Sequence, residues 1–78
     1  MELSPGTIKS ELSHLEDMFC TAEIYRGTRE GETHMKDALV EKGCLKRLGI
    51  VSDDDIHKMW NRAKGKAERT GRNYDKGA

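Results

Sequence analysis

Aromatic residues, cysteine and proline are scarce in this sequence, and long apolar runs are absent. The 78 residues include one phenylalanine, one tryptophan, two tyrosines, two cysteines and one proline. Two cysteines are too few for a disulfide-rich secreted scaffold, and an apolar run of about 18 residues, which would span a bilayer, does not occur. The first residues lack a basic segment followed by an apolar stretch, so we expect no signal peptide, no membrane association and a cytoplasmic protein with reduced thiols.

The supply of apolar residues is small for a globular chain. Hydrophobic residues form 35% of the sequence and charged residues form 36%. A chain of this length buries only about 60% of the surface that its unfolded form exposes, so its core is marginal. We therefore expect one helical domain over residues 1–70, with too little volume for a closed catalytic pocket.

The charges balance overall but are unevenly distributed. Residues 1–57 carry 12 acidic and 7 basic side chains, whereas residues 58–78 carry 2 acidic and 7 basic ones. A basic terminal segment is typical of an arm that binds nucleic acid, but basic residues also complement the dipole at the end of a helix, and we favour the second interpretation. The candidate nucleic-acid-binding residues are Lys58, Arg62, Lys64, Lys66, Arg69 and Arg72.

Regularly spaced apolar residues predict a long first helix over residues 5–26. Ser4 is a suitable cap, and Pro5 suits the first helical position. The apolar residues that share one face are Ile8, Leu12, Leu15, Phe19 and Ala22. Gly27 is suited to end the helix, and residues 27–33, with two glycines and no apolar residue, predict an exposed loop.

The second helix is less sharply defined by the sequence. Two residues with suitable capping chemistry precede it, Gly31 and Thr33. Gly43 interrupts its apolar pattern, and a glycine inside a helix costs about 1 kcal/mol relative to alanine. One alternative is a single helix over residues 34–48. The other, which we favour slightly, is a helix that stops at Lys42, followed by a short turn over residues 44–48.

The third helix is the most clearly marked. Ser52 can cap it, and three aspartates fill the first turn, where negative charge meets the positive end of the helix dipole. Val51 and Ile56 occupy the positions of a hydrophobic staple. Residues 71–78 show no periodicity and predict a flexible basic tail.

Together these patterns predict an all-α fold, a small bundle of three helices to which the short turn would add a fourth element. No stretch has the alternating pattern of a strand. The expected core residues are Leu12, Leu15, Phe19, Leu39, Leu48, Ile56, Met59 and Trp60.

The residues that carry chemistry are too dispersed to predict an active site. No two of the potential zinc ligands have the close spacing of a zinc finger; they are Cys20, Cys44, His14, His34 and His57. The aspartates at 53–55 lack the glycine and distal glutamate of a calcium loop. No serine lies in a strained nucleophile turn, and no histidine or aspartate is placed to activate a cysteine. We expect no enzyme, metal or cofactor.

Binding to a protein partner is the function that remains. On the first helix, Ile24 lies about 160° from Ile8 around the axis, on the face expected to be wet, and Cys20 is its neighbour on that side. A solvent-facing patch of Ile24 and Cys20 is a modest indication of an interface. The candidate partner-binding residues are Met18, Cys20, Ile24 and Tyr25. We expect a small adaptor, inhibitor or regulator that occupies a partner surface, of a kind common in phages and mobile elements. The alternative is nucleic-acid binding, and the long first helix also favours a homodimer.

Overall fold

Three helices account for the regular structure of the chain. The computed structural model describes the backbone of residues 4–77 and the side chains of residues 4–70. Its elements are α1 (Pro5–Ile24), α2 (Arg29–Arg47) and α3 (Asp53–Gly77), and the described backbone contains no strand. The prediction of an all-α fold with three helices is therefore confirmed.

The first helix begins and ends at local signals. The Ser4 hydroxyl accepts a hydrogen bond from the Thr7 backbone N–H at 3.2 Å, and Pro5 occupies the first helical position, as expected. α1 ends at Ile24, earlier than predicted, and Gly27 then adopts a φ of 87°. This left-handed conformation favours glycine, so the chain can turn sharply towards α2.

The turn between α1 and α2 is shorter than the sequence predicts. Thr28 caps α2 by accepting a hydrogen bond from the Gly31 N–H at 3.0 Å. The predicted exposed loop over residues 27–33, with a cap at Gly31 or Thr33, is therefore wrong. The reason is that Gly31 is buried against the backbone of Tyr25, where a Cβ would collide with the carbonyl group. This glycine permits two segments to approach closely and does not mark a flexible loop.

α2 runs through Gly43 without a break. The favoured prediction, a helix that stops at Lys42 before a turn over residues 44–48, is therefore wrong, and the alternative of one continuous helix is correct here. Ala38 and Leu45, which lie on either side of the glycine, are both buried. Their packing in the core offsets the low helix propensity of glycine.

Replacing Gly43 with alanine should stabilise the protein. A Cβ at this position would meet no atom within 4 Å outside its own helical surroundings, and alanine is favoured over glycine in a helix interior by about 1 kcal/mol. We expect the midpoint of thermal unfolding, followed by circular dichroism, to rise by about 4–8 °C. A lower midpoint for Gly43→Ala would contradict a continuous α2.

The third helix is capped by reciprocal hydrogen bonds. The Ser52 hydroxyl accepts from the Asp55 N–H at 3.2 Å, and the Asp55 carboxylate accepts from the Ser52 N–H at 3.2 Å, which holds the pKa of Asp55 below its ordinary value. Val51 and Ile56 are both buried, as a hydrophobic staple requires. The cap and the staple are as predicted. α3 extends to Gly77, past the position where the sequence predicts a flexible tail over residues 71–78 to begin, and the flexibility of this segment stays a prediction.

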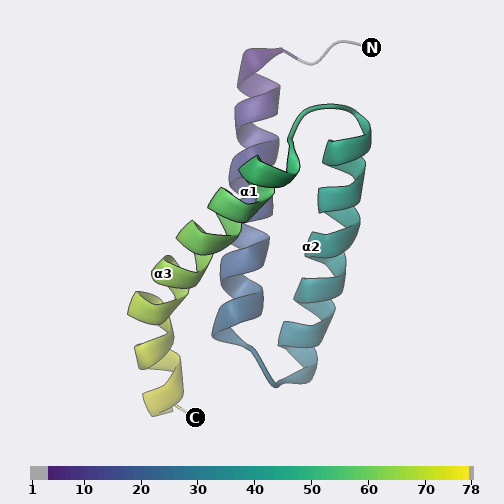
Figure 1. Cartoon of the computed structure of the whole chain (residues 1–78). Coiled ribbons are helices and arrows are strands. Elements are labelled where there is room, and N and C mark those ends of the chain that lie inside the picture. Colours follow the sequence, from purple (N-terminus) through teal and green to yellow (C-terminus); the bar gives the residue numbers. More distant parts are fainter. Residues whose placement is uncertain (1–3, 78) are drawn as a thin grey trace.

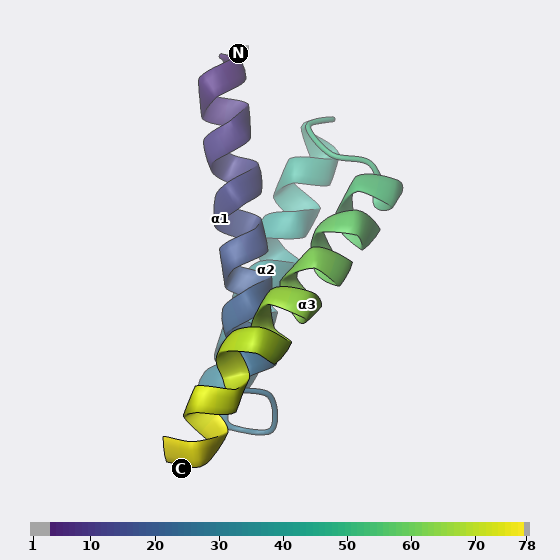
Figure 2. The ribbon, with the colours of Figure 1, turned by 90° about the vertical axis from the view of Figure 1, so that its left-hand side faces the viewer.

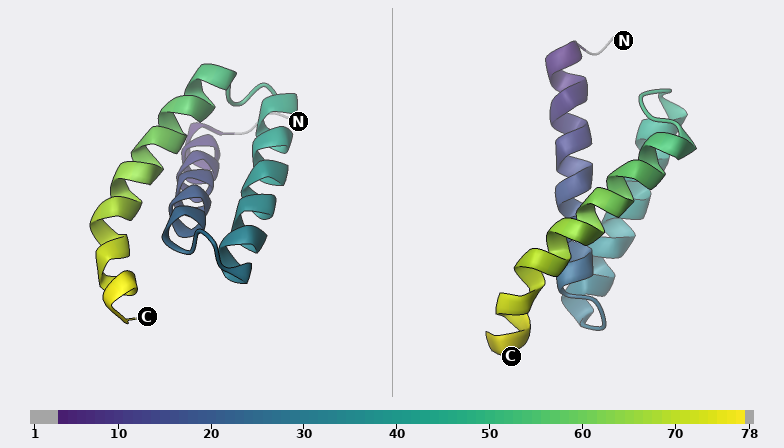
Figure 3. Two further views of the ribbon diagram at one scale, coloured as in Figure 1. Left: turned by 60° about the horizontal axis from the view of Figure 1, so that its bottom comes forward. Right: turned by 60° about the vertical axis from the view of Figure 1, so that its left-hand side comes forward.

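α1 lies between the other two helices (Figure 1). α1 and α2 run antiparallel, and α3 crosses α1 obliquely (Figure 2; Figure 3, right). Both α2 and α3 pack mainly against α1, and they diverge from each other beyond the loop that joins them (Figure 1; Figure 3, left). α1 is therefore covered on two sides, and α2 and α3 contact each other much less than either contacts α1.

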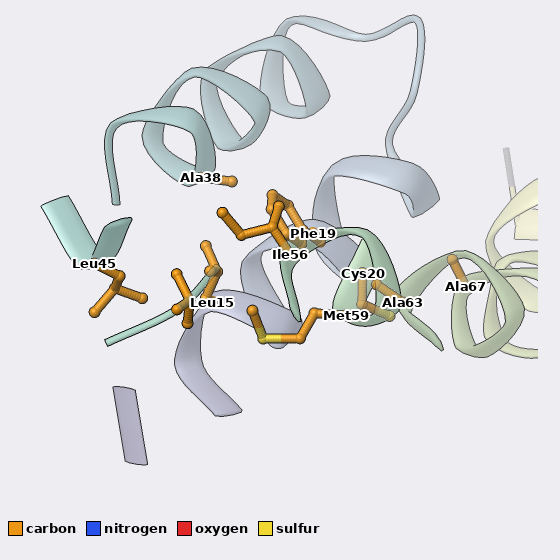
Figure 4. Packing of buried hydrophobic residues seen from close by; sticks show 10 residues of the cluster. Leu15, Phe19, Cys20, Ala38, Leu45, Ile56, Met59, Ala63 and Ala67 are labelled. Atoms are coloured by element: carbon orange, nitrogen blue, oxygen red, sulfur yellow. The ribbon is translucent and has the colours of Figure 1, made fainter. Parts of the chain in front are cut away.

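The core is one cluster of mostly small side chains from all three helices (Figure 4). Leu15 and Phe19 are the largest fully buried side chains. The Phe19 ring meets the Trp60 ring edge to face, with centroids 4.8 Å apart and an interplanar angle of 86°. Such a pair contributes about 0.5–1.5 kcal/mol beyond its buried area. The other core residues are Cys20, Ala22, Ala38, Leu45, Val51, Ile56, Met59, Ala63 and Ala67.

The predicted core is partly correct. Four of its residues are buried as expected, Leu15, Phe19, Ile56 and Met59, and two are half-buried against the cluster, Leu12 and Trp60. The prediction is wrong for Leu39 and Leu48, which are 51% and 70% exposed. Ala38 faces the core, so Leu39 lies about 100° away around α2, and Leu48 follows the last residue of that helix.

Candidate protein-interaction site

The surface predicted on α1 is largely covered by α3. Cys20 is buried in the core, and Met18 and Ile24 pack against it, so the expectation that Cys20 and Ile24 face solvent is wrong. α3 crosses this part of α1 (Figure 2) and covers a face that the periodicity of a single helix leaves open. Tyr25 is half-buried where α1 ends. The role of these four residues in partner binding stays a prediction, but they form no fully exposed patch.

The cysteines and other potential ligands form no chemical site in the described part of the chain. Burial raises the pKa of the Cys20 thiol, which keeps the thiol protonated and unreactive. Cys44 is half-buried, and Arg47 Nη2 lies 4.0 Å from its Sγ. Over residues 4–70, no three His, Cys, Asp or Glu side chains gather as metal ligands. No described helix combines the length and apolar character needed to cross a bilayer.

A groove of about 380 Å³ lies between the middle of α2 and the first two turns of α3. We call it the α2–α3 groove. Its lining residues are Phe19, Met35, Leu39, Lys42, Asp53, Ile56, His57 and Trp60. Phe19, the one lining residue from α1, is almost fully buried and forms the base. The groove is therefore a slot with two helical walls and an aromatic base.

The walls of the α2–α3 groove are apolar and partly exposed. Met35 and Leu39 are four residues apart and share one side of α2, as Ile56 and Trp60 do on α3. Leu39 is half exposed, and Met35 and Trp60 are half-buried. The contact with Phe19 fixes the Trp60 ring, so the groove has a rigid aromatic anchor.

The spacing of apolar residues does not predict this groove, because it assigns Leu39 to the core. One signal could have revealed the error. Ala38 and Leu45 are seven residues apart and point to the core together, whereas Leu39 and Met35 lie on a neighbouring stripe of the same helix. Two apolar stripes on one helix indicate two packing surfaces, only one of which α1 occupies.

Two lysines of α2 act on one aspartate at the rim of the groove. Lys46 Nζ lies 2.8 Å from Asp53 Oδ1, and this contact holds the pKa of Asp53 below its ordinary value, with a smaller contribution from the charge of Lys42. Lys42 lines the groove and makes no salt bridge to any residue that the structure describes. Asp53 is therefore the anion that both lysines share.

Half of the residues predicted to bind nucleic acid are engaged in ion pairs. The pairs are Lys58–Asp54 at 3.2 Å, Arg62–Glu16 at 3.2 Å and Lys66–Asp17 at 3.3 Å. Two of them connect α3 to α1, and Asp17 raises the pKa of Lys66. Lys64 and Arg69 make no salt bridge with the described residues, and the side chain of Arg72 lies outside them. The role of this basic segment stays a prediction.

Two glutamates approach each other between α1 and α2. Burial raises the pKa of Glu41. The Glu11 carboxylate raises it further, because it accepts a hydrogen bond from protonated Glu41 and because its negative charge disfavours a second one, and His14 has a smaller opposite effect. A carboxyl group whose folded-state pKa is raised binds protons more readily in the folded chain than in the unfolded chain. Stability is therefore lost as the pH rises through the pKa of Glu41 in the folded protein.

Glu41→Gln should stabilise the protein at neutral pH. The amide keeps hydrogen-bonding capacity towards Glu11 and removes the repulsion between the two carboxylates, for which we expect a gain of about 0.2–0.5 kcal/mol. The gain should disappear well below pH 4.5, the ordinary pKa of this group, because Glu41 is then protonated in both the folded and the unfolded wild-type chain. Urea unfolding of both proteins at neutral pH and at acidic pH measures this gain in stability. An equal gain at both pH values would contradict the carboxylate pair.

Comparisons with known proteins identify one similar segment. No family model and no solved structure matches the chain. Over 53 residues, 67% of its length, the chain is 42% identical to a disease resistance protein of Arabidopsis thaliana. The match spans 5% of that protein, so the chain is similar to a small segment of a much longer one.

Proposed function

We propose that this chain is a small cytoplasmic, non-enzymatic protein-interaction module that binds an amphipathic helix in the α2–α3 groove. The observation that carries the proposal is the arrangement of Leu39 and Trp60 on facing walls above Phe19. Recognition of a helix in a groove uses apolar anchors of this kind, spaced at helical intervals on the ligand. A protein that acts in this way works as an adaptor, inhibitor or regulator by occupying a partner segment.

The residue types of the groove support a protein ligand. Tryptophan is enriched among residues that dominate binding energy, and Met35 supplies a flexible side chain that adapts to its partner. The groove lies between one face of α2 and one face of α3, so a ligand helix would contact both. The similarity to a segment of a longer plant protein supports a module that also occurs within larger chains.

Nucleic-acid binding has less support among the described residues. Three of the six candidate residues already hold acidic partners, and three aspartates at the start of α3 would repel phosphates. Binding to a DNA duplex of mixed sequence, with an affinity that falls steeply with salt, would favour this alternative over the groove.

Leu39→Asp should strongly weaken binding of an amphipathic helix and leave the fold intact. The probe is a peptide of about 20 residues, long enough to be helical alone, with leucines at helical spacing and no tryptophan. Trp60 is the single tryptophan of the chain, so its fluorescence reports occupancy directly. A charge in an apolar site should weaken binding by about 2 kcal/mol or more.

Val40→Asp is the matched control for this experiment. Val40 is adjacent to Leu39, is 66% exposed, and does not line the groove. The same charge at this position should leave peptide affinity within about twofold of wild type. Equal affinity of the two variants, or no change in Trp60 fluorescence with the wild-type chain, would contradict the proposed function.

A further inference from the structure

The part of α3 that follows Trp60 packs on α1 through small side chains. Met59 and Trp60 are the last large apolar residues of α3 that lie in the core cluster or against it. Over residues 62–70, the buried side chains are Ala63 and Ala67. An alanine buries a single methyl group, and hydrophobic stabilisation grows with the apolar area removed from water. The apolar contribution to this contact therefore falls sharply beyond Trp60.

Two ion pairs supplement the packing of this segment on α1. Arg62 Nε lies 3.2 Å from Glu16 Oε2, and Lys66 Nζ lies 3.3 Å from Asp17 Oδ1. Both cations are at least half exposed, and exposed pairs contribute little and are screened by salt. α2 diverges from α3 beyond the loop that joins them (Figure 1), so α1 is the main support of this segment. Gly65 also lowers the helix propensity between the two pairs.

The side of α1 beneath this segment contains Cys20. This cysteine is 7% exposed and belongs to the same buried cluster as Ala63 and Ala67 (Figure 4). Burial raises the pKa of its thiol, and the charge of the nearby Lys66 has a smaller opposite effect. A thiol that is both covered and protonated does not react, because the thiolate is the nucleophile. The reactivity of Cys20 therefore depends on whether the end of α3 stays in place.

We propose that residues 62–70 form a lid that separates from α1 while the rest of the bundle stays folded. Segments with few buried apolar contacts open locally, at a lower free energy than global unfolding. The contact between the Phe19 and Trp60 rings, with centroids 4.8 Å apart, anchors α3 just before the lid. Opening uncovers Cys20, one of the residues that the sequence predicts to bind a partner, so the lid controls access to this side of α1. The lid is independent of helix binding in the α2–α3 groove.

Alkylation of Cys20 by iodoacetamide tests the lid in the full chain. Proteolysis and mass spectrometry after timed exposure to the reagent give the rate at Cys20 separately from that at Cys44. We expect Cys20 to react faster than global unfolding permits, with a rate that depends only weakly on urea below the unfolding transition, because a local opening exposes little surface. A rate whose urea dependence matches that of global unfolding would overturn the lid.

Arg62→Gln should raise the alkylation rate of Cys20 about twofold to fivefold, because it removes one of the ion pairs that hold the lid. Lys58→Gln is the matched control. It removes the same charge and breaks a pair of the same length, 3.2 Å, but that pair joins Lys58 to Asp54 within α3, so the rate should stay near that of wild type. High salt should raise the wild-type rate towards that of Arg62→Gln. Equal acceleration in the two variants, or none in Arg62→Gln, would overturn the proposal.

Discussion

Gly31→Ala is expected to destabilise the protein by about 3 kcal/mol or more. In an ordinary helix the same change is stabilising, because alanine has the higher helix propensity. Here a Cβ would overlap the carbonyl of Tyr25 and press on the N–H of Arg26. Both of these are backbone groups, which cannot rotate away as a side chain can. The first turn of α2 would have to move away from the end of α1.

Urea unfolding of Gly31→Ala beside Gly43→Ala measures this effect with an internal control. The two substitutions are chemically identical and lie in the same helix, but the Cβ at position 43 would meet open space. We expect opposite signs for the two changes in unfolding free energy. If Gly31→Ala were as stable as wild type, the close contact at Tyr25 would be wrong and the exposed loop predicted over residues 27–33 would be right.

Phe19→Ala is expected to cost about 3–5 kcal/mol. Phe19 is 2% exposed, contacts Trp60 edge to face, and belongs to the cluster that joins all three helices. A protein of this length has a total stability of about 4–12 kcal/mol, so this variant loses much of it. The same substitution removes the base of the α2–α3 groove, so binding of a helix should weaken in whatever fraction stays folded.

Phe19→Leu separates the two consequences. Leucine keeps most of the apolar volume but removes the aromatic pair, so the stability loss should fall to about 1–2 kcal/mol. Trp60 fluorescence would report the loss of its ring partner, and chemical unfolding the loss of stability. A Phe19→Ala protein with an unchanged unfolding transition would show that Phe19 does not lie at the centre of the core.

Features that depend on neighbouring residues were predictable from the sequence. The caps at Ser4 and Ser52 and the staple of Val51 with Ile56 each involve residues within five positions, so their chemistry can be recognised locally. The three-helix fold follows from the same signals together with the spacing of apolar residues.

Features that depend on how helices meet were not predictable in the same way. Gly31 resembles a loop glycine until α2 is placed against Tyr25. Cys20 and Ile24 lie off the main apolar stripe of α1, and only the crossing of α3 covers them. Periodicity identifies the principal buried face of a helix, but α1 has two, because α2 and α3 pack on different sides. The exposure of Leu39 has the same cause, since the position of α1 decides which stripe of α2 is left open.

The contacts of a bound helix decide whether the α2–α3 groove is the binding site. Intermolecular nuclear Overhauser effects between leucine methyl groups of the helical peptide and the isotope-labelled protein give these contacts directly. Binding in the groove predicts contacts to the Trp60 indole, to the Leu39 methyl groups and to Met35, the apolar side chains that remain at least partly exposed in the α2–α3 groove. Contacts instead to the outer face of α1, around Lys9 and Ser13, would contradict it.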